Sequence, residues 1–266
     1  MTLAFDVPLP VSSLLLLVLA AALAGWVDAV VGGGGLIQLP ALLVLLPGAL
    51  PAQVLATNKL ASICGTSTSA LTYYRRVRPD LRTALPMAAV ALAGASAGAA
   101  CASLLPVTVF RPLVLVLLVA VAVRTLLRPA LGEATVLRHT GAAHYGRALA
   151  VGGGIGFYDG IFGPGTGSFL VIALVSLLGY SFLEASAKAK ITNLATNFGA
   201  LLVFVPQGAP LWRLGLVMGG ANVVGGYVGA RTAVARGNRF VRLVFLVVVT
   251  ALIVRVGVDV ARAALD

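Results

Sequence analysis

Long apolar runs with almost no charge constrain this sequence more than any other feature. About ten of them follow one another along 266 residues, of which 60% are hydrophobic and only 10% are charged. Soluble domains carry roughly 25% charged residues, whereas a helix that crosses a bilayer needs about 20 consecutive apolar residues. The sequence therefore predicts an all-α membrane protein, a polytopic helical bundle whose solvent is the lipid bilayer.

The predicted membrane segments differ in length. Two of them, residues 35–47 and 166–179, are short and are expected to be half-helices or arms of re-entrant hairpins, which return the chain to the side it came from. The first run is interpreted as a membrane segment and not as a signal peptide. Residues 1–24 contain Asp6 but no Lys or Arg, so the basic region that begins a signal peptide is missing. The segments cover residues 9–31, 35–47, 53–73, 84–105, 109–128, 146–162, 166–179, 186–206, 211–234 and 240–261.

The positive charge lies between the apolar runs. A formal net charge of +11 would suggest nucleic acid for a soluble protein, but arginines that flank membrane segments mark the cytoplasmic side. Counting crossings puts three arginine clusters on one face, so we expect basic loops in the cytoplasm, both termini outside, location in the inner membrane and no nucleic-acid partner. The clusters are Arg75, Arg76, Arg78 and Arg82; Arg124, Arg128, Arg138 and Arg147; and Arg231, Arg236, Arg239 and Arg242.

Cysteine and histidine form no pattern for catalysis or metal binding. Cys64 and Cys101 lie inside apolar runs, without disulfide or metal-ligand spacing. His139 and His144 lie in a polar stretch, where a solvated loop is the simpler interpretation. We therefore expect no enzyme activity, no metal and no cofactor.

The chain contains an internal repeat. When the sequence is shifted by 131 residues, its halves align without a gap over roughly a hundred residues. We predict a first five-segment repeat at 1–130, a cytoplasmic linker at 131–145 and a second five-segment repeat at 146–266. Because each repeat has an odd number of crossings, the second is expected upside down, with a site between the halves near the midplane. The matching pairs include Gly25 and Gly156, Asp28 and Asp159, Lys59 and Lys190, Arg82 and Arg213, Gly94 and Gly225, and Gly98 and Gly229.

Glycine-rich breaks occur at matching places in the two halves. Glycine costs a helix about 1 kcal/mol relative to alanine, and irregular backbone at membrane depth must be buried in protein or line a cavity. A break frees N–H groups at the start of the next helix, which favour an anion; close packing of helices is the alternative. The paired Gly-x-x-x-Gly patterns at 94–98 and 225–229 are assigned to packing. The breaks comprise Gly32, Gly33, Gly34 and Gly35, and Gly163, Gly165 and Thr166.

Two lysines occupy matching positions inside apolar segments. A lysine there costs several kcal/mol unless it is paired or hydrated. Polar ladders beside both lysines predict a binding site for a small anionic substrate, and snorkelling toward the interface is the alternative. The neighbouring Lys188 points elsewhere and is expected to snorkel. Lys190, Asn193 and Asn197 share one helix face, and Lys59, Ser62 and Thr66 occupy the matching positions, with Asn58 beside them.

Asp28 and Asp159 are the acidic residues lodged near the glycine breaks. Burial would favour their protonated form, so they are candidates for coupling transport to an ion gradient. Pairing with the lysines and capping of backbone N–H groups are equally compatible with the sequence.

These motifs resemble those of the TauE/SafE family, also called TSUP transporters. Residues 25–35 read GWVDAVVGGGG and are followed by Thr57-Asn58-Lys59; residues 156–167 read GFYDGIFGPGTG and are followed by ASAKAKITN at 185–193. The resemblance covers nearly the whole chain. It implies a multi-pass bacterial or archaeal permease for sulfite, sulfonates or related organosulfur anions, which works as a secondary carrier, often an exporter, coupled to an ion gradient.

Other classes of function lead to different expectations. A passive anion channel would use the same lysines but would not accumulate its substrate against a gradient. A membrane assembly or sensing protein would tolerate loss of the lysines, and a membrane enzyme is the weakest alternative. A homodimer is a further expectation.

Overall fold

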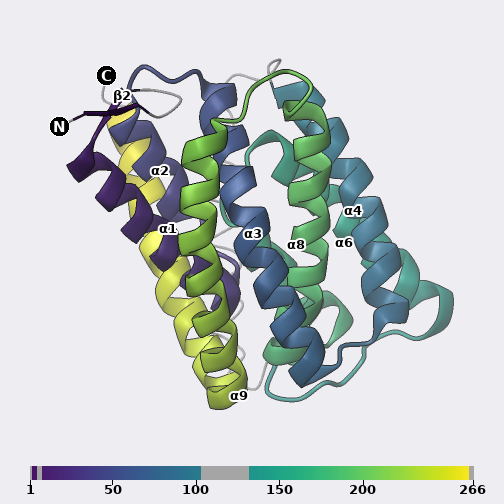
Figure 1. Ribbon diagram of the computed structural model, residues 1–266. Coiled ribbons are helices and arrows are strands. Elements are labelled where there is room, and N and C mark those ends of the chain that lie inside the picture. The colour runs from purple at the N-terminus through teal and green to yellow at the C-terminus, as the bar shows by residue number, and fades with distance from the viewer. Residues whose placement is uncertain (1, 5–7, 103–131, 264–266) are drawn as a thin grey trace.

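The protein is a bundle of tilted helices with a short β-ribbon at its N-terminal end (Figure 1). The computed structural model describes residues 2–4, 8–102 and 132–263, so the predicted segment 109–128 lies outside the described residues. Apart from the ribbon, in which β1 pairs antiparallel with β2, the elements are helical, as expected. They are β1 (Thr2–Ala4), β2 (Pro8–Pro10), α1 (Val11–Val31), α2 (Gly35–Leu45), α3 (Pro51–Val77), α4 (Leu81–Cys101), α6 (Gly141–Ile161), α7 (Thr166–Ala173), the π-helix η2 (Leu174–Leu178), α8 (Phe182–Phe204) and α9 (Trp212–Ala263).

Local sequence signals set several helix ends. Asp80 caps α4 by accepting the Arg82 N–H at 2.9 Å, and the Ser181 hydroxyl accepts the Glu184 N–H at the start of α8. Helix α3 begins with a proline, whose missing N–H costs nothing in the first turn. Helix α6 begins at Gly141, inside the stretch 131–145 that the sequence predicts as linker.

Two helices are too short to cross a bilayer. At about 1.5 Å per residue, α2 is about 16 Å long and α7 with η2 about 20 Å, against about 30 Å of hydrocarbon. Helix α2 follows the break at the end of α1, and its connection to α3 lies at the same end of the bundle as β2 (Figure 1). Thus α1 and α2 form a hairpin that turns inside the bundle.

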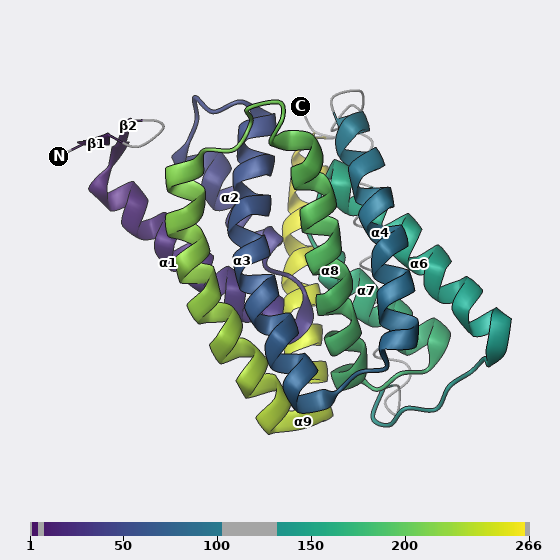
Figure 2. The ribbon, with the colours of Figure 1, turned by 45° about the vertical axis from the view of Figure 1, so that its right-hand side comes forward.

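Helix α9 contains a sharp bend. Gly237, with φ 71° and ψ −166°, interrupts the helical backbone between the predicted segments 211–234 and 240–261. These two segments therefore reverse direction at one residue, without a loop. The bend lies at the same end of the bundle as the α3–α4 connection and the segment before α6, so the described arginines of all three clusters gather at one end (Figure 2).

Glycines allow two helix pairs to pack closely, α1 with α9 and α4 with α6. A Cβ atom added to Gly98 would overlap the carbonyl oxygen of Phe157, and one added to Gly229 would overlap that of Trp26. These contacts correspond under the 131-residue shift, because Gly98 matches Gly229 and Trp26 matches Phe157. The assignment of the Gly-x-x-x-Gly patterns to helix packing is confirmed.

The bundle exposes large apolar side chains and buries several charged ones. Leu15, Leu19 and Leu23 of α1 are 58%, 66% and 54% exposed, whereas Lys59 and Lys190 are buried. Soluble proteins show the opposite distribution of charged side chains, but a helix surface in lipid has no water to face. By length and composition, α1 and α4 could each cross a membrane, with mean hydropathies of 2.4 and 1.6. Lipid is therefore the solvent that fits this exterior.

We expect Gly98→Ala to lower stability. The added methyl group meets backbone and must force α4 and α6 apart, which typically costs about 1–3 kcal/mol. Gly154→Ala is the matched control on α6, since nothing lies within 4 Å of its added Cβ. Thermal unfolding of the detergent-solubilised proteins measures both, and equal midpoints for the two variants would contradict the packing role of Gly98.

Candidate functional site

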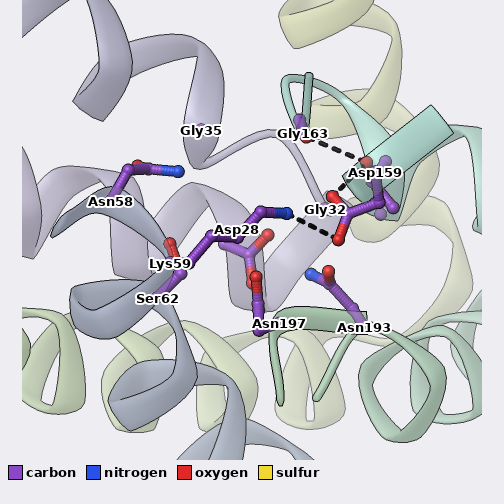
Figure 3. A pocket seen from close by; sticks show the side chains of 12 residues that line it. Asp28, Gly32, Gly35, Asn58, Lys59, Ser62, Asp159, Gly163, Asn193 and Asn197 are labelled. Atoms are coloured by element: carbon purple, nitrogen blue, oxygen red, sulfur yellow. Dashed lines mark hydrogen bonds and ion pairs between the residues drawn. The ribbon is translucent and has the colours of Figure 1, made fainter. Parts of the chain in front are cut away.

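A small cavity lies where the glycine breaks of the two halves meet (Figure 3). Helices α1 and α6 end beside it, α2 and α7 begin beside it, and α3 and α8 pass along it. Its volume is about 20 Å³, far below the roughly 300 Å³ at which pockets for drug-sized ligands start, so any ligand that it holds must be small. Its lining consists of Asp28, Gly32, Gly35, Asn58, Lys59, Ser62, Asp159, Gly163, Thr166, Gly167, Asn193 and Asn197.

The structure brings most of the predicted site residues into this lining. Four lie outside it: Gly33, Gly34, Gly165 and Lys190. Lys190 belongs to the site through its contact with Asp28, described below. Two lining residues, Ser62 and Gly167, were absent from the predicted site, although both lie within the motifs that the sequence displays.

The two glycine breaks touch each other through their backbones. Gly32 and Gly163 have φ values of 84° and 85°, which L side chains rarely adopt. The carbonyl oxygen of Gly32 accepts the N–H of Ser168 at 3.1 Å, and a Cβ on Gly32 would overlap Gly167. The breaks thus fasten the start of α7 to the end of α1.

The glycines outside the lining have packing contacts. A Cβ added to Gly34 would overlap the carbonyl oxygen of Ala24 on α1, and one added to Gly33 would press on a Val248 methyl group of α9. Gly165 has φ 81° and lies next to Leu36. The breaks therefore combine both interpretations offered by the sequence, since some of their glycines line a cavity and others allow close packing.

Two buried ion pairs cross between the halves of the chain. Lys59 Nζ lies 2.6 Å from Asp159 Oδ2 (Figure 3), and Lys190 Nζ lies 2.8 Å from Asp28 Oδ2. Each lysine thus pairs with the aspartate of the other half, and the 131-residue shift exchanges one pair with the other. Of the alternatives that the sequence leaves open, pairing of the aspartates with the lysines is the observed one, and neither lysine snorkels.

Amide side chains extend the polar lining away from the ion pairs. Asn197 Nδ2 donates to Thr66 Oγ1 at 3.2 Å, while Asn58 Oδ1 is buried without a hydrogen-bond partner among the described residues. Behind Asn58, the amides of Gln38 and Asn222 are joined by a 2.8 Å hydrogen bond. Sequence reasoning missed this last pair, although a polar residue inside an apolar run was the available signal.

Lys188 and His144 contradict the predictions made for them. Lys188 is fully buried, with its Nζ 4.2 Å from the Tyr180 ring centroid and without a hydrogen-bond partner in the part of the chain that is described. His144 is also buried, with Nε2 2.9 Å from the Tyr180 hydroxyl and 3.2 Å from Thr83 Oγ1. The predicted snorkelling and solvated loop are wrong, because α6 starts early enough to carry His144 into helix packing. Burial raises the pKa of Tyr180, so it remains a neutral phenol.

The cavity has charged and amide groups but no metal-binding arrangement. Within residues 2–4, 8–102 and 132–263, no group of three or more His, Cys, Asp or Glu side chains is placed to hold a metal ion. The site can therefore be described as two ammonium groups, two carboxylates and several amides around a small space between the halves.

Lys188→Met and Lys190→Met form a matched pair of tests, since both lysines are fully buried on α8. Removing Lys190 leaves the Asp28 carboxylate without its partner, and breaking a buried pair costs about 3–5 kcal/mol. Removing Lys188 deletes an ammonium without a hydrogen-bond partner, so we expect a change within about 1 kcal/mol. Equilibrium unfolding in mixed micelles measures both, and similar losses would argue against the ion pair as the source of stability.

Comparison with known proteins gives a consistent result. A family model described as "Sulfite exporter TauE/SafE" matches residues 17–256. A Sinorhizobium protein named "Probable membrane transporter protein ORF9" is 40% identical over 243 residues, which cover 91% of this chain and 92% of that protein. "Probable membrane transporter protein YfcA" of Escherichia coli strain K12 is 38% identical over 241 residues, covering 90% and 88%. A "Probable membrane transporter protein" of Haemophilus influenzae is 34% identical over 219 residues, covering 82% and 84%. No solved structure matches the chain.

Proposed function

The chain belongs to the sulfite exporter TauE/SafE family, and we propose that it is a secondary transporter of a small sulfur-containing anion, such as sulfite or a sulfonate. Its relatives are named as membrane transporters and not as enzymes. The observation that carries the proposal is a small cavity at the meeting point of two broken helices, lined by Lys59 and by Asp28, the ion-pair partner of Lys190.

The proposed architecture is a pair of five-segment repeats of inverted topology, about ten segments in all. Two observations support it. The ion pairs and the glycine contacts correspond under the 131-residue shift, and α3 and α8 run in opposite directions through the bundle (Figure 2). Transporters of this architecture bind substrate at the repeat interface and alternate access by moving one part against the other.

An anion fits the chemistry of the cavity. Lysine ammonium groups and amide N–H groups are donors for the oxygens of sulfite or a sulfonate, and the proposed contacts come from the glycine breaks, the two lysines and the three asparagines. In the structure each lysine is already neutralised by an aspartate. An incoming anion must therefore displace a carboxylate or arrive with a proton, and this makes Asp28 and Asp159 the candidates for ion coupling.

Sidedness follows from charge. Because the described arginine clusters lie at one end of the bundle, we assign that end to the cytoplasm, with both termini outside the inner membrane. We further propose export as the direction of transport, and a homodimer as the assembly.

The test is counterflow of labelled sulfite and methanesulfonate in liposomes that contain the purified protein. We expect saturable exchange that falls at least about tenfold in Lys59→Ala and in Lys190→Ala, since each change removes a charged donor of the site. Lys188→Met, a buried lysine outside the cavity, should exchange like the wild type.

Each other result has a definite meaning. If the wild type exchanges neither anion, the proposed substrate class is wrong. If both lysine variants exchange normally, the site is wrong, and movement only down a gradient without counterflow would indicate a channel. Gel filtration checks that each variant is folded. If Lys59→Ala aggregates, the double variant Lys59→Met/Asp159→Leu is used in its place, because it removes both charges of the ion pair and leaves neither unpaired.

A further inference from the structure

The two crossed ion pairs are not equivalent in their exposure. In the Lys59–Asp159 pair the side chains are 3% and 2% exposed, whereas Asp28 is 16% exposed and its partner Lys190 is fully buried. Asp28 lines the cavity, and Lys190 lies behind it, outside the lining. Only in this second pair does water in the cavity have appreciable access to a carboxylate.

The carboxylates also differ in their support. Asp159 Oδ1 accepts the Thr166 hydroxyl at 2.6 Å while Oδ2 faces Lys59. In the first half the residue that matches Thr166 is Gly35, which has no hydroxyl. Among the described residues, Lys190 alone donates to the Asp28 carboxylate. One donor therefore stabilises the ionised form of Asp28, whereas two donors stabilise the ionised form of Asp159.

We propose that Asp28 is the proton-binding group of the transporter and that Lys59–Asp159 is a structural ion pair that stays charged during transport. This inference rests on the proposed function. A proton from water adds to the Asp28 carboxylate, which becomes a neutral acid beside the free ammonium of Lys190. A small anion then enters the cavity and restores the lost negative charge. When proton and anion leave, the Lys190–Asp28 pair forms again.

Charge balance makes the coupling between proton and anion obligatory. In the empty site two ammonium groups and two carboxylates sum to zero, and one proton with one monovalent anion also sum to zero. An anion alone leaves the site at −1, and a proton alone leaves it at +1. Because an uncompensated charge in the bilayer core is costly, only the empty and the doubly loaded states cross readily. Transport of a monovalent anion should therefore be electroneutral, with one proton per anion. Net export then occurs when the outward gradient of the anion exceeds the inward gradient of protons.

Few other charged or titratable groups lie next to Asp28. The charged and titratable groups that face it among the described residues are Lys190 from α8, Lys59 and Tyr73 from α3, and Asp159 from α6. The Tyr73 hydroxyl already donates to a backbone carbonyl oxygen of α1 at 3.0 Å. Helices α2 and α7 contribute glycine and threonine to the cavity, and α9 packs on α1 through glycines.

The decisive comparison is Asp28→Asn against Asp159→Asn in liposomes. Asp28→Asn fixes the empty site at +1 and the anion-loaded site at zero, so the loaded carrier still crosses but the empty one does not. We expect methanesulfonate counterflow to be retained, while uptake driven by an imposed pH gradient falls by about 100-fold. Asp159→Asn has the same net charge, but it breaks the buried Lys59–Asp159 ion pair and leaves Lys59 without its partner, so it should lose both activities. Glu133→Gln, an exposed carboxylate, should behave like the wild type.

A second measurement uses the unmodified protein, in case Asp28→Asn does not fold. Proton-driven uptake of methanesulfonate, a permanent monovalent anion, is recorded with the membrane potential set by potassium and valinomycin. We expect a rate that does not depend on the potential. Sulfite replaces methanesulfonate if only sulfite is exchanged, with the pH held where the monovalent form dominates.

The outcomes separate this inference from the proposed function. If the wild type exchanges neither anion, both are overturned. If the wild type exchanges the anion but Asp28→Asn keeps its response to a pH gradient, or loses counterflow while folded, Asp28 is not the proton site. If uptake by the wild type depends on the membrane potential, the one-to-one stoichiometry is wrong. If Asp159→Asn keeps counterflow but loses its response to the pH gradient, Asp159 and not Asp28 is the proton site.

Discussion

Lys59 and Lys190 can lie inside an apolar bundle only because each finds a carboxylate in the other half of the chain. A single buried charge would cost several kcal/mol in this environment. Neither half supplies the partner for its own lysine, so each half completes the other. The two halves must therefore approach closely at the ion pairs. The glycine breaks allow this approach, since Gly32 and Gly167 let the ends of the broken helices touch through their backbones. The crossed ion pairs thus account for the close approach of the broken helices at the center of the bundle.

Departures from the internal repeat give the two halves different properties. Thr166 supports Asp159, but its match Gly35 offers Asp28 nothing. Buried Lys188 matches Thr57, whose hydroxyl accepts the N–H of Leu211 at 3.0 Å. A perfectly symmetric carrier would treat its two faces alike, whereas these substitutions place one more exposed carboxylate in the cavity and one buried cation near the basic end. The asymmetry of the site therefore arises at individual residues.

The sequence predicted much of the fold because the relevant signals are local. Apolar runs located the helices that are described, and rare residues such as Asp28 and Lys59 stood out against an apolar background. His144 was misplaced because a polar stretch can be a loop or the first turn of a helix, and α6 starts at Gly141. The Gln38–Asn222 pair was missed because each amide gains its importance only from the other.

By itself, the sequence determined the apolar character of a membrane protein, the positions of the glycine breaks, the internal repeat and most of the residues that gather at the cavity, since hydropathy and backbone freedom act along the chain. Only the tertiary structure decided which lysine meets which aspartate, that Lys188 is buried against Tyr180, and that Asp28 faces the cavity more openly than Asp159. These are properties of contacts between helices far apart in the chain. Their energies depend on burial and distance, which a linear pattern does not contain.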